Sequence, residues 1–127
     1  MDPISWAQPL SERDVVLQVA IHDEQVPNFA SDSLARSAGL QVLRPEVSLP
    51  SDLTAAKGPL TRGYVQFDPQ KPPAPEANRP APVTDAHTDP RDWTGQRQQV
   101  THYLRTGRLE HFCGGSPCSA SNPGGDP

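Results

Sequence analysis

The stretch VVLQVAIHDEQVPN, residues 15–28, decides the fold class of this chain. Its first seven residues, Val15–Ile21, are mostly apolar and β-branched, which predicts a strand buried on both faces. The strand runs directly into His22, Asp23 and Glu24. Parallel α/β sheets place their sites just beyond the carboxyl ends of the strands, so we expect the sheet to position Asp23 at a crevice.

A first helix and a second strand are expected after this stretch. Asn28 is suited to cap a helix over Phe29–Ala38, and Gly39 is suited to end it in a left-handed conformation. Residues Leu40–Leu43 are either a short strand or a connection. The sequence GYVQFDP, residues 63–69, alternates polar and apolar side chains and predicts another strand.

A second helix is expected over Arg91–Thr106, after a helix start at Asp89 and Pro90 and before Gly107. The prediction is therefore an incomplete α/β unit with two or three strands, two helices and long Pro-rich loops. We assign residues 1–112 to this partial domain. It includes a Pro-rich loop, 69–90, which holds seven prolines, and residues 113–127 are expected to form a flexible tail.

The composition and charge of the chain argue against several classes of protein. Only 34% of the 127 residues are hydrophobic, and 16 prolines and 9 glycines resist regular structure. A net charge of −4 without a basic run argues against a nucleic-acid partner. The longest apolar run is too short to span a bilayer, and the start MDPISWAQPL has no features of a signal peptide. Localisation stays open.

Two loops carry a family resemblance. The sequence IHDEQVP, residues 21–27, resembles the acid loop of α/β-hydrolases, in which an aspartate orients the catalytic histidine. In VTDAHTDPRDW, residues 83–93, His87 follows the second strand, where that fold carries its histidine. The order of acid before histidine also agrees with that fold. The chain as a whole is similar to the C-terminal segment of large bacterial α/β-hydrolase-like proteins of the esterase or lipase type, which are often exported.

The resemblance implies a serine-hydrolase site with Asp23 and His87 as its acid and base, and an ester or lipid-like substrate for the complete protein. The serine is missing, however. The elbow that carries it reads G-x-S-x-G and precedes the acid. The nearest string, GGSPC at residues 114–118, lacks the last glycine and follows His87. We therefore expect the isolated chain to be inactive and to need no cofactor. The alternative is a non-catalytic, partly disordered interaction protein or secreted accessory protein.

Each candidate residue also has an ordinary interpretation. Asp23 is otherwise a solvated loop carboxylate or a charge at a helix start, and His87 is otherwise an unremarkable residue of a flexible acidic loop. We expect His22 to be an exposed neighbour of the acid, and His102 to lie on the exposed side of its helix.

The two cysteines, Cys113 and Cys118, are separated by a four-residue loop that is able to bring them within disulfide range. We expect a disulfide if the parent protein is exported, and two thiols in a reducing cytosol. A zinc site that adds His111 is a weaker interpretation, because a second pair of ligands is lacking, and we assign no metal. An incomplete sheet also leaves an exposed strand edge, from which we expect self-association.

Overall fold

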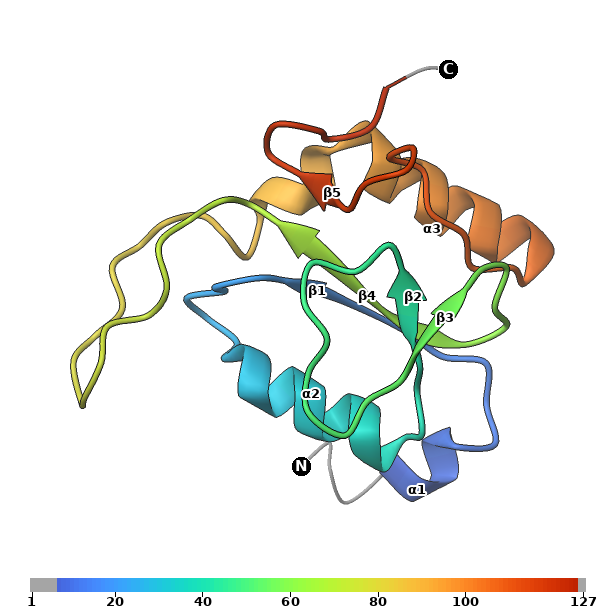
Figure 1. Ribbon diagram of the computed structural model, residues 1–127, viewed down its shortest axis with the longest axis horizontal. Coiled ribbons are helices and arrows are strands. Elements are labelled where there is room, and N and C mark those ends of the chain that lie inside the picture. The colour runs from blue at the N-terminus through green and yellow to red at the C-terminus, as the bar shows by residue number, and fades with distance from the viewer. Residues whose placement is uncertain (1–6, 126–127) are drawn as a thin grey trace.

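A computed structural model describes residues 7–125 of the chain. In chain order its elements are α1 (Ala7–Leu10), β1 (Val16–Ala20), α2 (Asn28–Ser37), β2 (Val42–Arg44), β3 (Ala55–Lys57), β4 (Gly63–Asp68), the 3₁₀ helix η2 (Asp89–Asp92), α3 (Thr94–Thr106) and β5 (Cys118–Ser119). A mostly parallel sheet with helices on its two faces results (Figure 1). The predicted α/β class is therefore confirmed.

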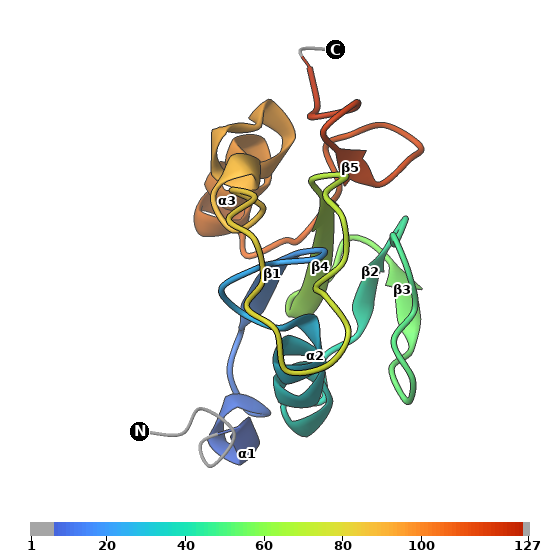
Figure 2. The same ribbon diagram turned by 90° about the vertical axis from the view of Figure 1, so that its left-hand side faces the viewer.

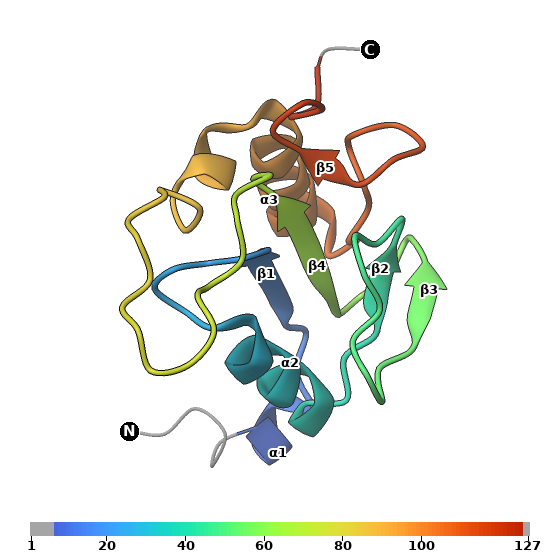
Figure 3. The same cartoon turned by 60° about the vertical axis from the view of Figure 1, so that its left-hand side comes forward.

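The strands follow the order β1-β4-β2-β3, and β5 pairs with β4 beyond the end of β2 (Figure 3). All of these strand pairs are parallel. The longest ladder joins β1 to β4, from the pair Val16 and Gly63 to the pair Ala20 and Phe67. Among the described residues β1 pairs with β4 alone, so it forms one end of the sheet.

The core consists of two clusters, one on each face of the sheet. The strand β4 contributes to both, because its side chains alternate in direction. Tyr64 packs with Ala35 and Ala38 near α2, whereas Val65 and Phe67 pack with Leu109 and the two cysteines on the α3 side. The view in Figure 2 shows α2 and α3 on opposite sides of the strands. This packing buries the carboxyl ends of β1 and β4, at Ala20 and Phe67.

The first helix differs from its prediction at its start. Asn28 is the first residue of α2 rather than its cap, Pro27 precedes it, and no side chain caps the helix. The Asn28 side chain is instead bonded to the loop that precedes the helix, as described below. The end agrees with the prediction, since Gly39 has a φ of 65° and donates its amide to the carbonyl of Arg36.

The predicted helix over Arg91–Thr106 is wrong in its first turn. Trp93 is extended, with φ −77° and ψ 138°, and separates η2 from α3. This conformation lets the Trp93 ring pack edge-on against Phe67, with ring centroids 6.3 Å apart. Leu104 of this helix is 78% exposed, whereas Gln99 is 1% exposed and donates to the carbonyl of Glu110.

Two strands were not predicted, namely β3 and β5. The second of them lies in the segment that we expected to be a tail, and Cys113 and Cys118 form a disulfide there. This segment also accepts a hydrogen bond at the Pro123 carbonyl from the amide of Gly95, at the start of α3. Within residues 7–125 no helix is long and apolar enough to cross a membrane.

Candidate active site

The loop after β1 is fixed by its own side chains. His22 has a positive φ of 58°, which turns the chain sharply out of the strand. Asn28 holds this turn, since its Oδ1 accepts from the His22 amide at 2.8 Å and its Nδ2 donates to the Ala20 carbonyl at 2.6 Å. The side chain that we expected to cap α2 therefore shapes the acid loop instead.

Asp23 lies within this loop and its carboxylate is almost fully buried, with 6% of the side chain exposed. Its Oδ1 accepts hydrogen bonds from the amides of Gln25 and Val26, at 2.7 and 2.9 Å. These two bonds fix the rotation of the carboxylate and leave Oδ2 for one further partner. That partner is a histidine from a distant part of the chain.

His87 is this partner. Its Nδ1 lies 2.7 Å from Asp23 Oδ2, and 25% of its side chain is exposed. The two residues are 64 positions apart in the sequence. They meet because β1 and β4 are adjacent and parallel, so the loops that follow them start from the same edge of the sheet. The structure thus brings together the two residues that the sequence analysis selected.

The far nitrogen of His87 also has a partner. Nη2 of Arg91 lies 2.9 Å from Nε2 of His87. A guanidinium group only donates hydrogen bonds, and an ionised carboxylate only accepts them. The two contacts therefore assign the proton to Nδ1 and the lone pair to Nε2. This is the neutral tautomer that a histidine needs in order to accept a proton at Nε2.

Glu24 supports the backbone beneath His87. Its Oε2 accepts from the Thr84 hydroxyl at 3.0 Å and from the His87 amide at 3.4 Å. The pKa of Glu24 is lowered, first by its own backbone amide and then by Thr84 and His87, although burial opposes this. The ionised Glu24 therefore ties the Pro-rich loop to the acid loop.

A cavity of about 250 Å³ opens beside the pair, and its lining includes Asp23, His87, Arg91, Gln96 and Phe67. Gln96 donates to the side chain of Gln18 on β1, and Gln18 donates to Gln99. The floor of the cavity is thus built by β1, β4 and α3. Its volume is below the range of about 300–1,000 Å³ that is typical of pockets for small organic molecules.

The other candidate residues do not contact this pair through the hydrogen bonds described above. His22 is exposed, as predicted, and its Nδ1 contacts the Lys71 carbonyl at 2.7 Å. His102 is half-buried rather than exposed, because its ring packs against Phe112 with centroids 5.4 Å apart. The disulfide of Cys113 and Cys118 lies beneath α3 together with His111.

Comparison of the chain with protein-family models, with curated proteins and with solved structures gave no match. The interpretation of the site therefore depends on its geometry.

Three residues that contact the Asp23–His87 pair or its loops, namely Glu24, Arg91 and Thr84, were not predicted from the sequence. Glu24 adjoins Asp23 and Arg91 follows His87 by four residues, so proximity in sequence is a usable signal for both. Thr84 gave no such signal, because only the path of the loop brings it to Glu24.

Proposed function

We propose that this chain supplies the acid and the histidine of a Ser-His-Asp triad in a serine hydrolase that cleaves carboxylic esters. The observation that carries the proposal is the 2.7 Å contact between Asp23 Oδ2 and His87 Nδ1. The carboxylate in this pair is buried and oriented by two backbone amides, as a residue that holds a catalytic imidazole must be. The proposal also includes an origin in the C-terminal part of an α/β-hydrolase-like protein.

The roles follow from the tautomer. A serine hydroxyl placed at Nε2 of His87 would donate its proton to the imidazole as its oxygen attacks the ester carbonyl. Asp23 would hold the Nδ1 proton and stabilise the imidazolium that forms. His87 would then return the proton to the departing alkoxide, so that the alcohol leaves and an acyl-enzyme remains. A water molecule, deprotonated by His87 in the same way, would then attack the acyl-enzyme and release the carboxylic acid.

The nucleophile and the oxyanion hole have to come from elsewhere, because the sequence lacks a G-x-S-x-G elbow. The position of β1 at the end of the described sheet supports this part of the proposal. A strand there offers an unpaired edge to a neighbour. Further strands of a longer polypeptide would extend the sheet on this side and bring a serine to the site.

The test is to sequence and express the longer open reading frame that contains this chain. We expect the upstream part to encode G-x-S-x-G, and the product to hydrolyse short p-nitrophenyl esters. His87→Ala and Asp23→Ala should each lower kcat by about 10³-fold or more, because triad residues act as a unit. His102→Ala, which changes a histidine outside the site, should keep the activity within about twofold.

Two results would overturn the proposal. One is a reading frame that starts at Met1 and has its own ribosome-binding site. The other is an active longer product whose turnover survives the His87 substitution.

A further inference from the structure

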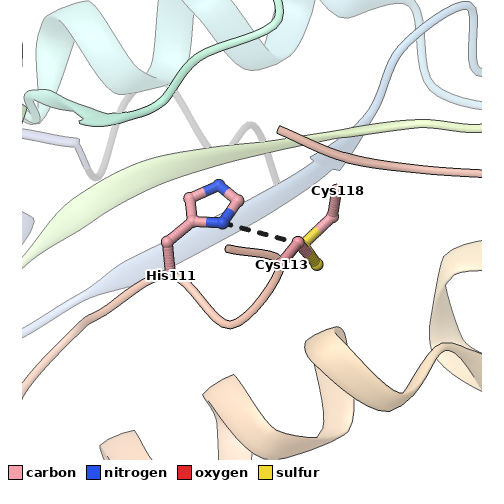
Figure 4. Close-up of side chains that lie close together, drawn as sticks. All are labelled: His111, Cys113 and Cys118. Carbon is pink, nitrogen blue, oxygen red and sulfur yellow. Dashed lines mark hydrogen bonds between the residues drawn. A yellow bond between two sulfur atoms is a disulfide. The ribbon is translucent and has the colours of Figure 1, made fainter. Parts of the chain in front are cut away.

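A second cluster of reactive side chains lies on the opposite side of β4 from α2, beneath the start of α3. It consists of His111, Cys113 and Cys118, whose ligand atoms all lie within 4.8 Å of one another. Nδ1 of His111 is 3.7 Å from Sγ of Cys118 and is directed toward the disulfide (Figure 4). The two cysteines are 5% and 1% exposed.

We propose that reduction of the Cys113–Cys118 disulfide converts this cluster into a three-ligand binding site for Zn²⁺. The redox state of the disulfide then controls whether the metal binds, because two sulfurs bonded to each other are not thiolate ligands. This site is separate from Asp23 and His87, and it does not depend on the ester-hydrolase proposal.

The donor set suits zinc. Two thiolates and one imidazole, with one position left for water, is an established ligand combination for Zn²⁺. Zn–S distances of about 2.3 Å place two sulfurs of a tetrahedral site about 3.8 Å apart. The Cα atoms of the two cysteines are 5.2 Å apart, so the reduced sulfurs need only side-chain rotation to reach this separation. Two thiolates, a neutral imidazole and Zn²⁺ also sum to zero charge, which suits a buried position.

His111 is prepared for a ligand role. Its Nε2 is buried and has no well-formed hydrogen bond, and Nδ1 faces the sulfurs. Burial lowers the pKa of His111, against the weaker opposing effect of the Pro45 carbonyl. A backbone carbonyl near the ring is also the usual outer partner of a metal-binding histidine.

The first turn of α3 also favours the thiolate forms of Cys113 and Cys118. A Cβ added to Gly95 would lie 2.4 Å from Cys113 Sγ and 3.3 Å from Cys118 Sγ, so the sulfurs contact the first turn of the helix. The partial positive charge at a helix N-terminus stabilises a nearby thiolate and makes it a better metal ligand.

A dithiol is a sufficient reductant for the Cys113–Cys118 disulfide. The dithiol transfers two electrons and two protons to the disulfide, and its own sulfurs form a new disulfide. Cys113 and Cys118 become thiols, and each loses a proton when Zn²⁺ binds. Zn²⁺ binding to the reduced chain should therefore release protons from the thiols.

The experiment titrates Co²⁺ and then Zn²⁺ into the full chain, with and without a phosphine reductant that binds metals weakly. We expect one Co²⁺ per reduced chain, with thiolate-to-cobalt charge-transfer absorption and the strong visible bands of a tetrahedral ion. Zn²⁺ should displace it. The oxidised chain and the Cys113→Ser/Cys118→Ser variant should show neither absorption.

The contribution of His111 is tested in two ways. His111→Ala should weaken Zn²⁺ binding by about tenfold or more, whereas His102→Ala, a matched change on the neighbouring helix, should not. X-ray absorption of the wild-type zinc complex should show two sulfur ligands and one imidazole, which does not depend on the folding of any variant. Circular dichroism would verify that the reduced chain keeps its helices.

Three results would overturn the proposal. They are a folded, reduced chain that binds no metal, equal binding by the oxidised chain, and a zinc spectrum without an imidazole ligand.

Discussion

Arg91 donates to Nε2 of His87 over 2.9 Å, on the ring atom opposite the one that contacts Asp23. In the proposed triad a serine hydroxyl would occupy this position. The guanidinium therefore competes with the nucleophile for one lone pair, and it also preserves the tautomer that the nucleophile requires.

The isolated chain is predicted to be inactive. Because its sequence lacks a nucleophile elbow, its hydrolysis of short p-nitrophenyl esters should equal that of its own His87→Ala variant. Initial rates at several enzyme concentrations would measure this. A rate that rises with the chain and disappears in Ser116→Ala would show that a serine of this chain attacks, and the fragment proposal would fail.

Asp23→Asn should disturb the tautomer of His87. An amide does not hold the Nδ1 proton as a carboxylate does, and loss of a charged hydrogen bond should cost about 1.5–3 kcal/mol of unfolding free energy. Nitrogen-15 NMR of the imidazole reports the tautomer directly. Asp85→Asn is the matched control, because Asp85 is exposed and asparagine tolerates its φ of 61°. Retention of the Nδ1–H form in Asp23→Asn would mean that Asp23 does not orient His87.

Arg91→Ala should expose the lone pair of His87. Diethyl pyrocarbonate acylates unprotonated imidazole nitrogens, so its reaction at His87 should become severalfold faster when the guanidinium is removed. Peptide mapping by mass spectrometry would follow each histidine separately. Arg105→Ala removes an exposed arginine of α3 and should leave the rate unchanged. Equal rates in the two variants would show that Arg91 does not occupy Nε2 in solution.

Gly95→Ala tests the packing of the disulfide against α3. Alanine is the better helix former by about 1 kcal/mol, but its Cβ would overlap Cys113 Sγ and overpacking costs about 1–3 kcal/mol. We therefore expect a net loss of up to about 2 kcal/mol in a denaturant titration. Gly115→Ala is the control, since no atom lies within 4 Å of its added Cβ. A stabilised Gly95→Ala variant would contradict the contact.

The sequence was sufficient to locate Asp23 and His87 because both follow strands with strong β-branched or alternating patterns. It was insufficient for β3 and β5, which span three and two residues and have no apolar periodicity. The role of Asn28 was misassigned for a related reason. A residue at a helix start has a strong local preference for capping, but here the acid loop offered its side chain two backbone partners. Tertiary contacts of this kind leave no local pattern.

The last prediction concerns the outer edge of β1. The Val15 carbonyl and the Ile21 amide both bond to β4, so the alternate residues Val16 and Gln18 direct their backbone groups away from it. The next residue of that set, Ala20, has its carbonyl covered by Asn28. We expect the rest of this edge to pair with another chain, and the isolated protein to be marginally stable, since a small sheet with an unpaired edge buries little apolar surface.

Val16→Pro should suppress this association, because it removes an outward amide and leaves the bonds from β1 to β4 in place. Sedimentation equilibrium over a range of concentrations would compare the variant with the wild type. Amide NMR dispersion and a denaturant titration would report the stability of the monomer. A wild-type chain that stays monomeric, shows well-dispersed signals and unfolds cooperatively only at high denaturant would be a complete domain. The proposal that further strands of a longer polypeptide pair with β1 would then have no physical support. The origin proposed for this chain would have to be abandoned.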